Sequence, residues 1–224
     1  MTVLGLIRHA ATPWNREKRL QGRTDLDLCP EGVQDARSWA RVLAPMAFGR
    51  VVCSPLVRAR HTAEILAGVL DAGLPVVMAG LTEQHFGQWE GRRLSEIRQE
   101  EPGEVEAREA MGWLFQPPGG ESREAVLKRS LKALEQAALV LPDHGSMGDS
   151  AKVYGTGGAR ILVVTHASVI KAVIYHLLGR SLVRPGSRVL KSGHVHLVSW
   201  NPEAGLLLDQ VNAADLAANP MEDP

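Results

Sequence analysis

The sequence predicts an α/β fold in which helices cover both faces of a mostly parallel sheet with an antiparallel edge strand. Short apolar runs alternate with stretches whose apolar residues recur at helical spacing, which is typical of this class. The apolar runs are almost continuous, as expected of strands buried on both faces. The last two runs are joined by Asn201-Pro202 and Gly205, which predicts a hairpin at the end of the chain.

The predicted strands are short, and the first is the clearest. Residues 3–7 are apolar, and Arg8-His9 end the run abruptly. A buried strand that delivers polar side chains at its carboxyl end explains this pattern. The further predicted strands comprise residues 50–53, 75–78, 161–165, 195–200 and 206–211.

Three helices are predicted between the strands, over residues 30–44, 56–70 and 167–178. Pro30 suits the first position of a helix, and Glu31 suits the positive end of the helix dipole. An apolar stripe at helical spacing follows in the first helix. Gly179 predicts the end of the third helix.

We expect residues 1–224 to form a single domain that carries a mainly helical insertion at about residues 82–141. Pro117 to Gly120 interrupts the insertion, and residues 142–158 are rich in Gly, Ser and Asp, as expected of a surface loop. In the tail, residues 213–224, only Leu216 is expected to contribute to the core. The insertion is too poor in strands to be a second α/β domain.

Composition excludes several classes of protein. The 224 residues contain 25 Lys plus Arg and 25 Asp plus Glu, and this balance disfavours partners such as nucleic acid or a membrane surface. The hydrophobic fraction of 45% suffices for a sizeable core. Two cysteines, Cys29 and Cys53, cannot form a disulfide scaffold, and we expect reduced thiols. The sequence shows no targeting segment and no apolar run of membrane-spanning length, so we expect a cytoplasmic protein.

Ligands of open α/β sheets bind beyond the carboxyl ends of the strands, and chemically active residues gather there in this sequence. The residues that follow the predicted strands are Arg8, His9, Ser54, Arg58, Arg60, Glu83, His85, Thr165 and His166. Arginines bind phosphate oxygens, a neutral imidazole is a nucleophile near pH 7, and a carboxylic acid can protonate a departing oxygen. These parts indicate phosphoryl transfer through a phosphohistidine without a metal or other cofactor.

Six segments in the same order resemble the histidine phosphatase superfamily, which includes the cofactor-dependent phosphoglycerate mutases. The first, LIRHAATPWN at residues 6–15, is similar to the family signature L-x-R-H-G-x-T-x-x-N. The others are LQGRTDLDL at 20–28, SPLVRARHTA at 54–63, LTEQHFGQWEG at 81–91, PGGES at 118–122 and VTHA at 164–167. The resemblance implies a phosphoglycerate mutase-like three-layer α/β/α sandwich.

The resemblance also implies a role for each matching residue. His9 matches the phosphorylated histidine, Arg8 and Arg58 the arginines that bind the phosphoryl group, and His166 the second histidine of the pocket. Glu83 matches the proton donor, with Glu90 as a nearby competitor. The substrate contacts implied are Asn15, Gln21, Gly22 and Ala167. Ala10, Ala11, Cys29 and Ala167 depart from the residues that relatives commonly carry, which leaves substrate detail open.

The stretch around Glu83 favours a phosphatase over a mutase. The mutases carry E-R-H-Y-G-x-L there, whereas this chain has Gln84 in place of the arginine that helps to bind the carboxylate of phosphoglycerate. The expected substrate is a small phosphate monoester of unknown identity. A mutase, a non-catalytic protein that binds phosphorylated ligands, and a metal-dependent hydrolase using His194 and His196 are the alternatives. The sequence leaves a homodimer open.

Overall fold

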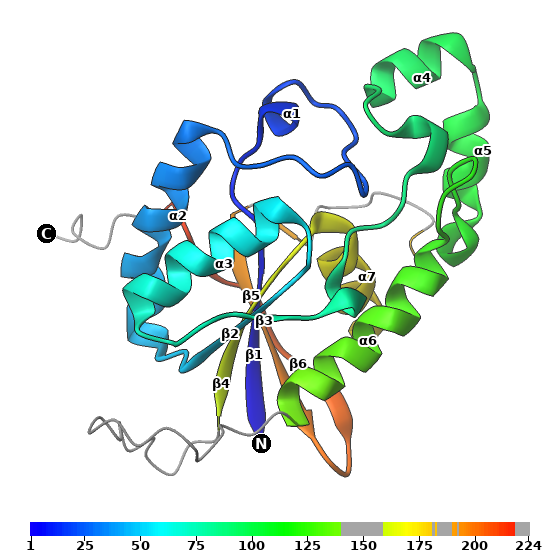
Figure 1. Cartoon of the computed structure of the whole chain (residues 1–224). Helices are drawn as coiled ribbons and strands as arrows, with labels where there is room; N and C mark the ends of the chain where they lie inside the picture. The colour runs from blue at the N-terminus through cyan, green and yellow to red at the C-terminus, as the bar shows by residue number, and fades with distance from the viewer. Residues whose placement is uncertain (140–158, 181, 183–189, 192, 218–224) are drawn as a thin grey trace, which may run out of the picture.

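The computed structural model describes residues 1–139, 159–180, 182, 190–191 and 193–217. Six strands form one sheet in the order β3-β2-β4-β1-β5-β6 (Figure 1). Their bounds are β1 Thr2–Arg8, β2 Arg50–Cys53, β3 Val76–Val77, β4 Arg160–Thr165, β5 His194–Asn201 and β6 Gly205–Asp215. The predicted strands are thus all present.

The sheet is mixed, as predicted. Strands β1, β2, β3 and β4 pair in parallel, β5 pairs antiparallel with β1, and β6 pairs antiparallel with β5 as the edge strand. The predicted hairpin between the last two strands is confirmed. Strand β6 extends to Asp215 and therefore includes part of the predicted tail, while Leu216 is buried as expected.

Seven α-helices lie in the described part of the chain. Their bounds are α1 Pro13–Arg16, α2 Pro30–Leu43, α3 Val57–Leu70, α4 Leu94–Glu100, α5 Glu104–Ala110, α6 Arg123–Leu139 and α7 Ala167–Leu177. Single turns of 3-10 helix occupy Ala44–Met46, Ala79–Leu81, Gly87–Trp89 and Gly112–Leu114. Helix α2 begins at Pro30, and Gly179, with a φ of 61°, follows the end of α7, both as predicted.

Helices cover both faces of the sheet, which gives the three-layer arrangement (Figure 1). Side chains alternate along β4: Ile161 and Val163 pack in the core beneath α6 and α7, whereas Leu162 and Val164 pack in the core beneath α2 and α3. Each of these four side chains is almost fully buried. Burial of one such side chain contributes roughly 1.5–3 kcal/mol, so the two cores hold the strand ends firmly in place.

The described part of residues 82–141, which ends at Leu139, contains helices and single turns of 3-10 helix but no strand. Helices α4 and α5 lie at the upper right of Figure 1, beyond the end of α6 and away from the middle of the sheet. A small core within this part of the chain joins Trp89, Ile97, Val105 and Phe115. No helix in the described ranges is both long and apolar enough to cross a membrane. The predicted loop at 142–158 lies outside the described residues.

Candidate active site

Three neighbouring strands deliver the predicted residues to one edge of the sheet. Arg8 ends β1, Ser54 follows β2, and His166 follows β4. Because β2, β4 and β1 are adjacent in the sheet, their carboxyl ends meet. The imidazole rings of His9 and His166 lie with their centroids 5.1 Å apart. The topology therefore brings both histidines into one buried cluster of polar side chains, which we call the phosphoryl pocket.

His9 is held so that one ring nitrogen, Nε2, carries a lone pair, as a nucleophile needs. Its Nδ1 lies 2.8 Å from the carbonyl oxygen of Ala10, and its Nε2 lies 3.2 Å from Nε of Arg58. A carbonyl only accepts and a guanidinium only donates, so the proton sits on Nδ1 and the lone pair on Nε2. Burial, reinforced by the cations Arg8 and Arg58, holds the pKa of His9 well below its usual range. His9 is therefore neutral near pH 7.

Arg58 lies in the first turn of α3 and is fully buried. Its Nη1 and Nη2 donate to the carbonyl oxygens of Thr24 (3.0 Å) and Gly22 (2.8 Å), while Nε donates to His9. It forms no ion pair with Glu64, and its neighbour Arg60 is exposed. The guanidinium thus joins His9 to the loop around Gly22.

Several polar atoms of the phosphoryl pocket have no protein partner. Within the described chain, Nε of Arg8, Nδ1 of His166 and Oε1 of Gln21 are buried without a hydrogen bond. The other ring nitrogen of His166, Nε2, lies 2.7 Å from Oγ of Ser54. Leaving a buried polar group unpaired costs about 1–3 kcal/mol, more for a charged group. The buried guanidinium of Arg58, the partly buried one of Arg8 and an unpaired imidazole nitrogen therefore form a site that suits an anion.

Glu83 has the environment of a proton donor. Its side chain is buried, and burial raises the pKa of its carboxyl group. A hydrogen bond of 2.8 Å from the backbone N–H of Gln84, the nearby cations Arg8 and Arg58, and a hydrogen bond with Ser168 act in the opposite direction. A carboxyl group with a raised pKa keeps more of its proton toward neutral pH, as general acid catalysis needs.

Glu90, the competing carboxylate, has a different environment. Its oxygens accept hydrogen bonds from the backbone N–H groups of Arg23 (2.9 Å), Thr24 (3.0 Å) and Phe86 (3.0 Å), and from the hydroxyl of Thr24 (2.8 Å). A Cβ atom at Gly22 would overlap Oε1 of Glu90, and the φ of 54° at this position also favours glycine. Glu90 therefore fastens two loops together, which favours Glu83 as the acid.

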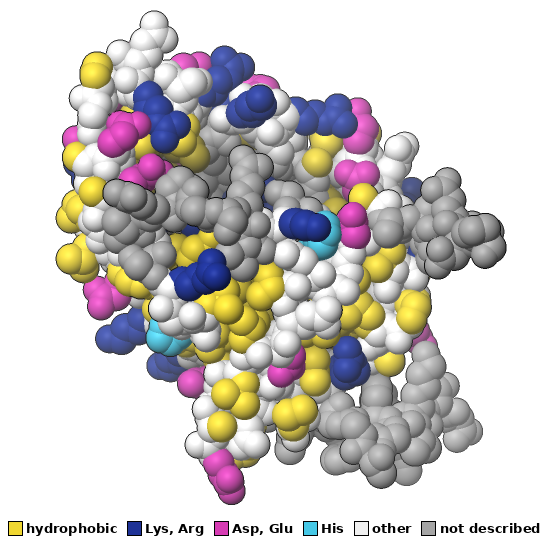
Figure 2. Space-filling view, turned by 180° about the vertical axis from the view of Figure 1, so that it is seen from behind, with side chains coloured by type: hydrophobic (Ala, Val, Ile, Leu, Met, Phe, Trp, Pro, Cys, Tyr) yellow, Lys and Arg dark blue, Asp and Glu magenta, His cyan; other side chains and the backbone are white. Residues whose placement is uncertain are grey.

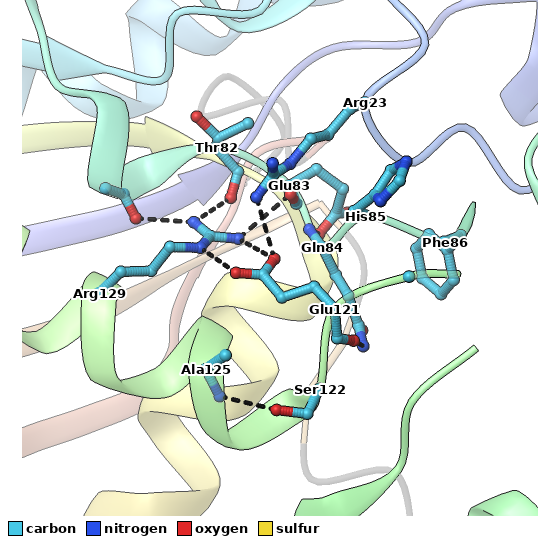
Figure 3. Close-up of polar contacts among 12 residues, drawn as sticks. Arg23, Thr82, Glu83, Gln84, His85, Phe86, Glu121, Ser122, Ala125 and Arg129 are labelled. Carbon is cyan, nitrogen blue, oxygen red and sulfur yellow. Dashed lines mark hydrogen bonds and ion pairs between the residues drawn. The ribbon is translucent and has the colours of Figure 1, made fainter. Parts of the chain in front are cut away.

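Arg129 of α6 holds the segment that carries Glu83 (Figure 3). Its guanidinium donates to the carbonyl oxygens of Gly80, Thr82 and Glu83, and it forms two hydrogen bonds, 2.8 and 2.9 Å long, with the carboxylate of Glu121. Arg23 reaches the same carboxylate at 3.2 Å. Three carbonyl acceptors between Gly80 and Glu83 are thus bound by a single side chain.

The residues predicted to contact the substrate differ in their burial and in their hydrogen bonds. Oδ1 of Asn15 accepts from the N–H and the hydroxyl of Thr12, so this oxygen caps the short helix α1. Gly22 has a φ of 54° and supplies its carbonyl to Arg58, and Gln21 is buried beside it. Ala167 is exposed at the start of α7, directly after His166.

The other candidates lie apart from the phosphoryl pocket. His196 is buried in β5, where its Nδ1 accepts the N–H of Asn212, and burial lowers its pKa to about 4. His194 lies 3.9 Å from Asp215. No group of three potential metal ligands occurs among the described residues. His85 is partly exposed, 3.7 Å from Glu90.

The sequence analysis missed Arg129, Thr62 and Ser168. Oγ1 of Thr62 accepts a hydrogen bond from the N–H of Ala10 at 3.1 Å and donates to the carbonyl of Arg58 at 2.7 Å, so it connects the segment that carries His9 to α3. Thr62 lies inside the SPLVRARHTA segment, which was the available signal. For Arg129, the sequence indicates only a place on the polar face of a helix and nothing about a role near Glu83.

This fold and this pocket are together typical of proteins that transfer phosphoryl groups. The family model of the histidine phosphatase superfamily (branch 1) matches residues 4–213, and the chain belongs to that family. A glucosyl-3-phosphoglycerate phosphatase of Mycolicibacterium vanbaalenii is 34% identical over 79% of this chain and 74% of its own. A 2,3-bisphosphoglycerate-dependent phosphoglycerate mutase of Cytophaga hutchinsonii is 26% identical over 79% of this chain and 78% of its own. A solved structure of mycobacterial glucosyl-3-phosphoglycerate phosphatase in complex with VO3 has a TM-score of 0.76, 27% identity, and covers 95% of this chain and 99% of that one.

Proposed function

We propose that this protein is a phosphatase that hydrolyses small phosphate monoesters through a phosphohistidine at His9. The observation that carries the proposal is the buried, neutral His9, whose Nε2 lies 3.2 Å from Nε of Arg58 and whose pKa is lowered by burial and by the nearby cations Arg8 and Arg58. Neither guanidinium forms an ion pair in the part of the chain that the structure describes. Membership of the family and the similarity to a named phosphatase support the same activity.

In the first step, Nε2 of His9 attacks phosphorus, and the bond from phosphorus to the ester oxygen breaks. Arg8, Arg58 and His166 bind the equatorial oxygens, on which charge spreads in the transition state. Glu83 gives its proton to the departing oxygen, so the alcohol leaves neutral.

In the second step, water attacks the phosphorus of the phosphohistidine. The carboxylate of Glu83 accepts a proton from this water, and the nitrogen–phosphorus bond breaks. Inorganic phosphate, neutral His9 and protonated Glu83 result, so the cycle closes. Side chains alone carry both steps, and we therefore propose that the reaction needs neither a metal nor another cofactor.

A mutase is the second candidate, because one relative has that name. It would pass the phosphoryl group from His9 to a second phosphorylated substrate rather than to water. Gln84 favours the phosphatase: it is uncharged, and its Nε2 donates to the carbonyl of Glu121 at 2.7 Å. A cation that would bind the carboxylate of phosphoglycerate is absent at this position.

The test is the release of inorganic phosphate from a panel of monoesters that includes 3-phosphoglycerate. We expect wild-type protein to release phosphate, and His9→Ala to lose this activity completely. His176→Ala is the matched control, since His176 is exposed near the end of α7. Isomerisation of 3-phosphoglycerate without phosphate release would instead establish the mutase.

We also propose a cytoplasmic location and no nucleic-acid partner. Cys29 and Cys53 are buried free thiols, which suit a reducing compartment. Basic and acidic side chains are interspersed on the face shown in Figure 2, in agreement with the net charge of zero. A homodimer remains a prediction, which sedimentation would test.

A further inference from the structure

A cavity of about 160 Å³ is lined by residues of α4, α5, α6 and α7 and of the segment that follows Glu83. Gln84, which follows Glu83, lines it, and so does Ser168, which is hydrogen-bonded to the Glu83 carboxyl. A proton donor must lie next to the oxygen that departs, so the rest of the leaving group extends on the Glu83 side. We call this space the leaving-group cavity.

Most of the wall of the leaving-group cavity is apolar. The apolar side chains include Leu20, Phe86, Trp89, Leu94, Val105 and Phe115. A leaving group covered with hydroxyl groups would make few apolar contacts with this wall. A leaving group with several apolar carbon atoms would instead bury the wall. The indole Nε1 of Trp89 is buried and, among the described residues, has no partner.

Two cations complete the wall. Lys171 lies on the same face of α7 as Ser168, three residues further on, and Arg123 begins α6. Arg123 stacks over the ring of Phe115 at 4.0 Å and donates to the carbonyl of Gly112. Neither cation forms an ion pair within the described ranges; Glu109, also in the wall, lies 3.8 Å from Arg98.

These charges do not balance inside the cavity. Arg123 and Lys171 face the single carboxylate of Glu109, and burial lowers the pKa of both cations. A neutral ligand would keep two cations partly desolvated without a counter-ion, which is unfavourable. A ligand with a negative group would neutralise them.

We propose that the leaving-group cavity binds an alcohol that combines an apolar body with a carboxylate, and that Lys171 and Arg123 bind this carboxylate. The inference rests on the proposed phosphatase function and names the substrate class of the same site. Lys171 and Arg123 are thus specificity-determining residues, which act on the choice of ester rather than on the phosphoryl group.

The test compares two esters of similar size and leaving-group acidity: 4-ethylphenyl phosphate and 4-(carboxymethyl)phenyl phosphate. We expect wild-type protein to prefer the carboxylate ester by about tenfold in kcat/KM, as one charge-assisted contact would give. Lys171→Met and Arg123→Met should each remove most of this preference, whereas Lys171→Arg should keep it. Lys128→Met, an exposed position of α6, should leave the preference unchanged.

Because the preference is a ratio measured on one preparation, a variant that is partly unfolded still gives a valid answer. No preference in the wild-type protein, or a preference unchanged in both Met variants, would overturn the inference. Hydrolysis of p-nitrophenyl phosphate without hydrolysis of either ester would overturn it too. If none of the three esters is hydrolysed, the panel of monoesters distinguishes the two failures: phosphate release from the panel would overturn the inference alone, and no release would overturn the phosphatase function as well.

Discussion

The phosphoryl pocket and the leaving-group cavity meet at Glu83 and Ser168, yet they are built differently. The pocket is formed by residues that follow adjacent strands, and its side chains are fixed by short hydrogen bonds to backbone carbonyls. The cavity is formed between helices, with an apolar wall and two cations that have no ion pair in the described chain. The difference indicates that the sheet edge determines the chemistry, while the helices determine which ester is used.

The largest effect expected from a change in the phosphoryl pocket, apart from loss of His9, comes from Arg58. Arg58→Ala removes a donor that binds the developing charge, so kcat/KM should fall by at least about 10²-fold. Since the phosphoryl group is common to all substrates, the loss of kcat/KM should be the same for 4-ethylphenyl phosphate and 4-(carboxymethyl)phenyl phosphate. Steady-state kinetics with both esters measure this, and Arg60→Ala, at an exposed position, is the control. A loss of kcat/KM with only one of the two esters would show that Arg58 contacts the leaving group.

Glu83 lies where the two regions meet, and its removal should depend on the leaving group. Glu83→Gln cannot donate a proton, so phosphorylation of His9 by alkyl phosphates should slow by about 10²-fold. p-Nitrophenolate leaves without a proton, and its ester should be affected far less. Single-turnover rates measure this step separately from hydrolysis of the phosphohistidine.

The matched variant is Glu90→Gln, which alters a carboxylate that binds backbone N–H groups. It should lower Tm while the ratio of the alkyl to the p-nitrophenyl rate stays that of the wild type. A selective loss of the alkyl rate in Glu90→Gln, together with none in Glu83→Gln, would transfer the acid role to Glu90.

The pH dependence should follow from the two opposite pKa shifts. His9 must be neutral, and its pKa is held below the usual 6.5, so protonation stops the reaction only in acid. Glu83 must be protonated, and burial raises its pKa above the usual 4.5. The rate therefore falls as the pH rises through this raised pKa. For alkyl phosphates we expect this alkaline loss in single-turnover rates across a pH series. For p-nitrophenyl phosphate it should be absent, and an equal loss with both substrates would argue against Glu83 as the acid.

The smallest effect is expected from Arg129, which contacts the loop of Glu83 rather than the substrate. Arg129→Met should lower the rate with alkyl phosphates by about tenfold, because the donor is less well placed, with little change for p-nitrophenyl phosphate. Arg129→Lys should restore part of the rate. An equal loss with both substrates would indicate a general effect on folding, and thermal unfolding of each variant checks this.

The sequence predicts the phosphoryl pocket well because its residues follow strands that are recognisable from their apolar runs. Arg8, His9 and His166 each stand at the end of such a run, and a parallel sheet brings those ends together. Arg58 could be chosen over Arg60 only through the resemblance to the family. The structure then brings these residues together.

The leaving-group cavity could not be predicted in this way. Lys171 and Arg123 lie on helices, where a charged residue normally marks a solvated face, and only the packing of α6 against α7 brings them to one cavity. The part played by Glu90 depends on three backbone N–H groups from two loops, which no spacing in the sequence reveals. The length of β6 depends on pairing with β5 rather than on its own residues.

The central claim is that His9 carries the phosphoryl group during turnover. Wild-type protein should be mixed with a monoester labelled with ³²P, quenched in alkali within milliseconds, and analysed for label bound to protein. We predict an acid-labile, alkali-stable label on His9 that forms before phosphate is released and is absent in His9→Ala. Hydrolysis by the wild-type protein without any such label, or a label that persists in His9→Ala, would contradict the account.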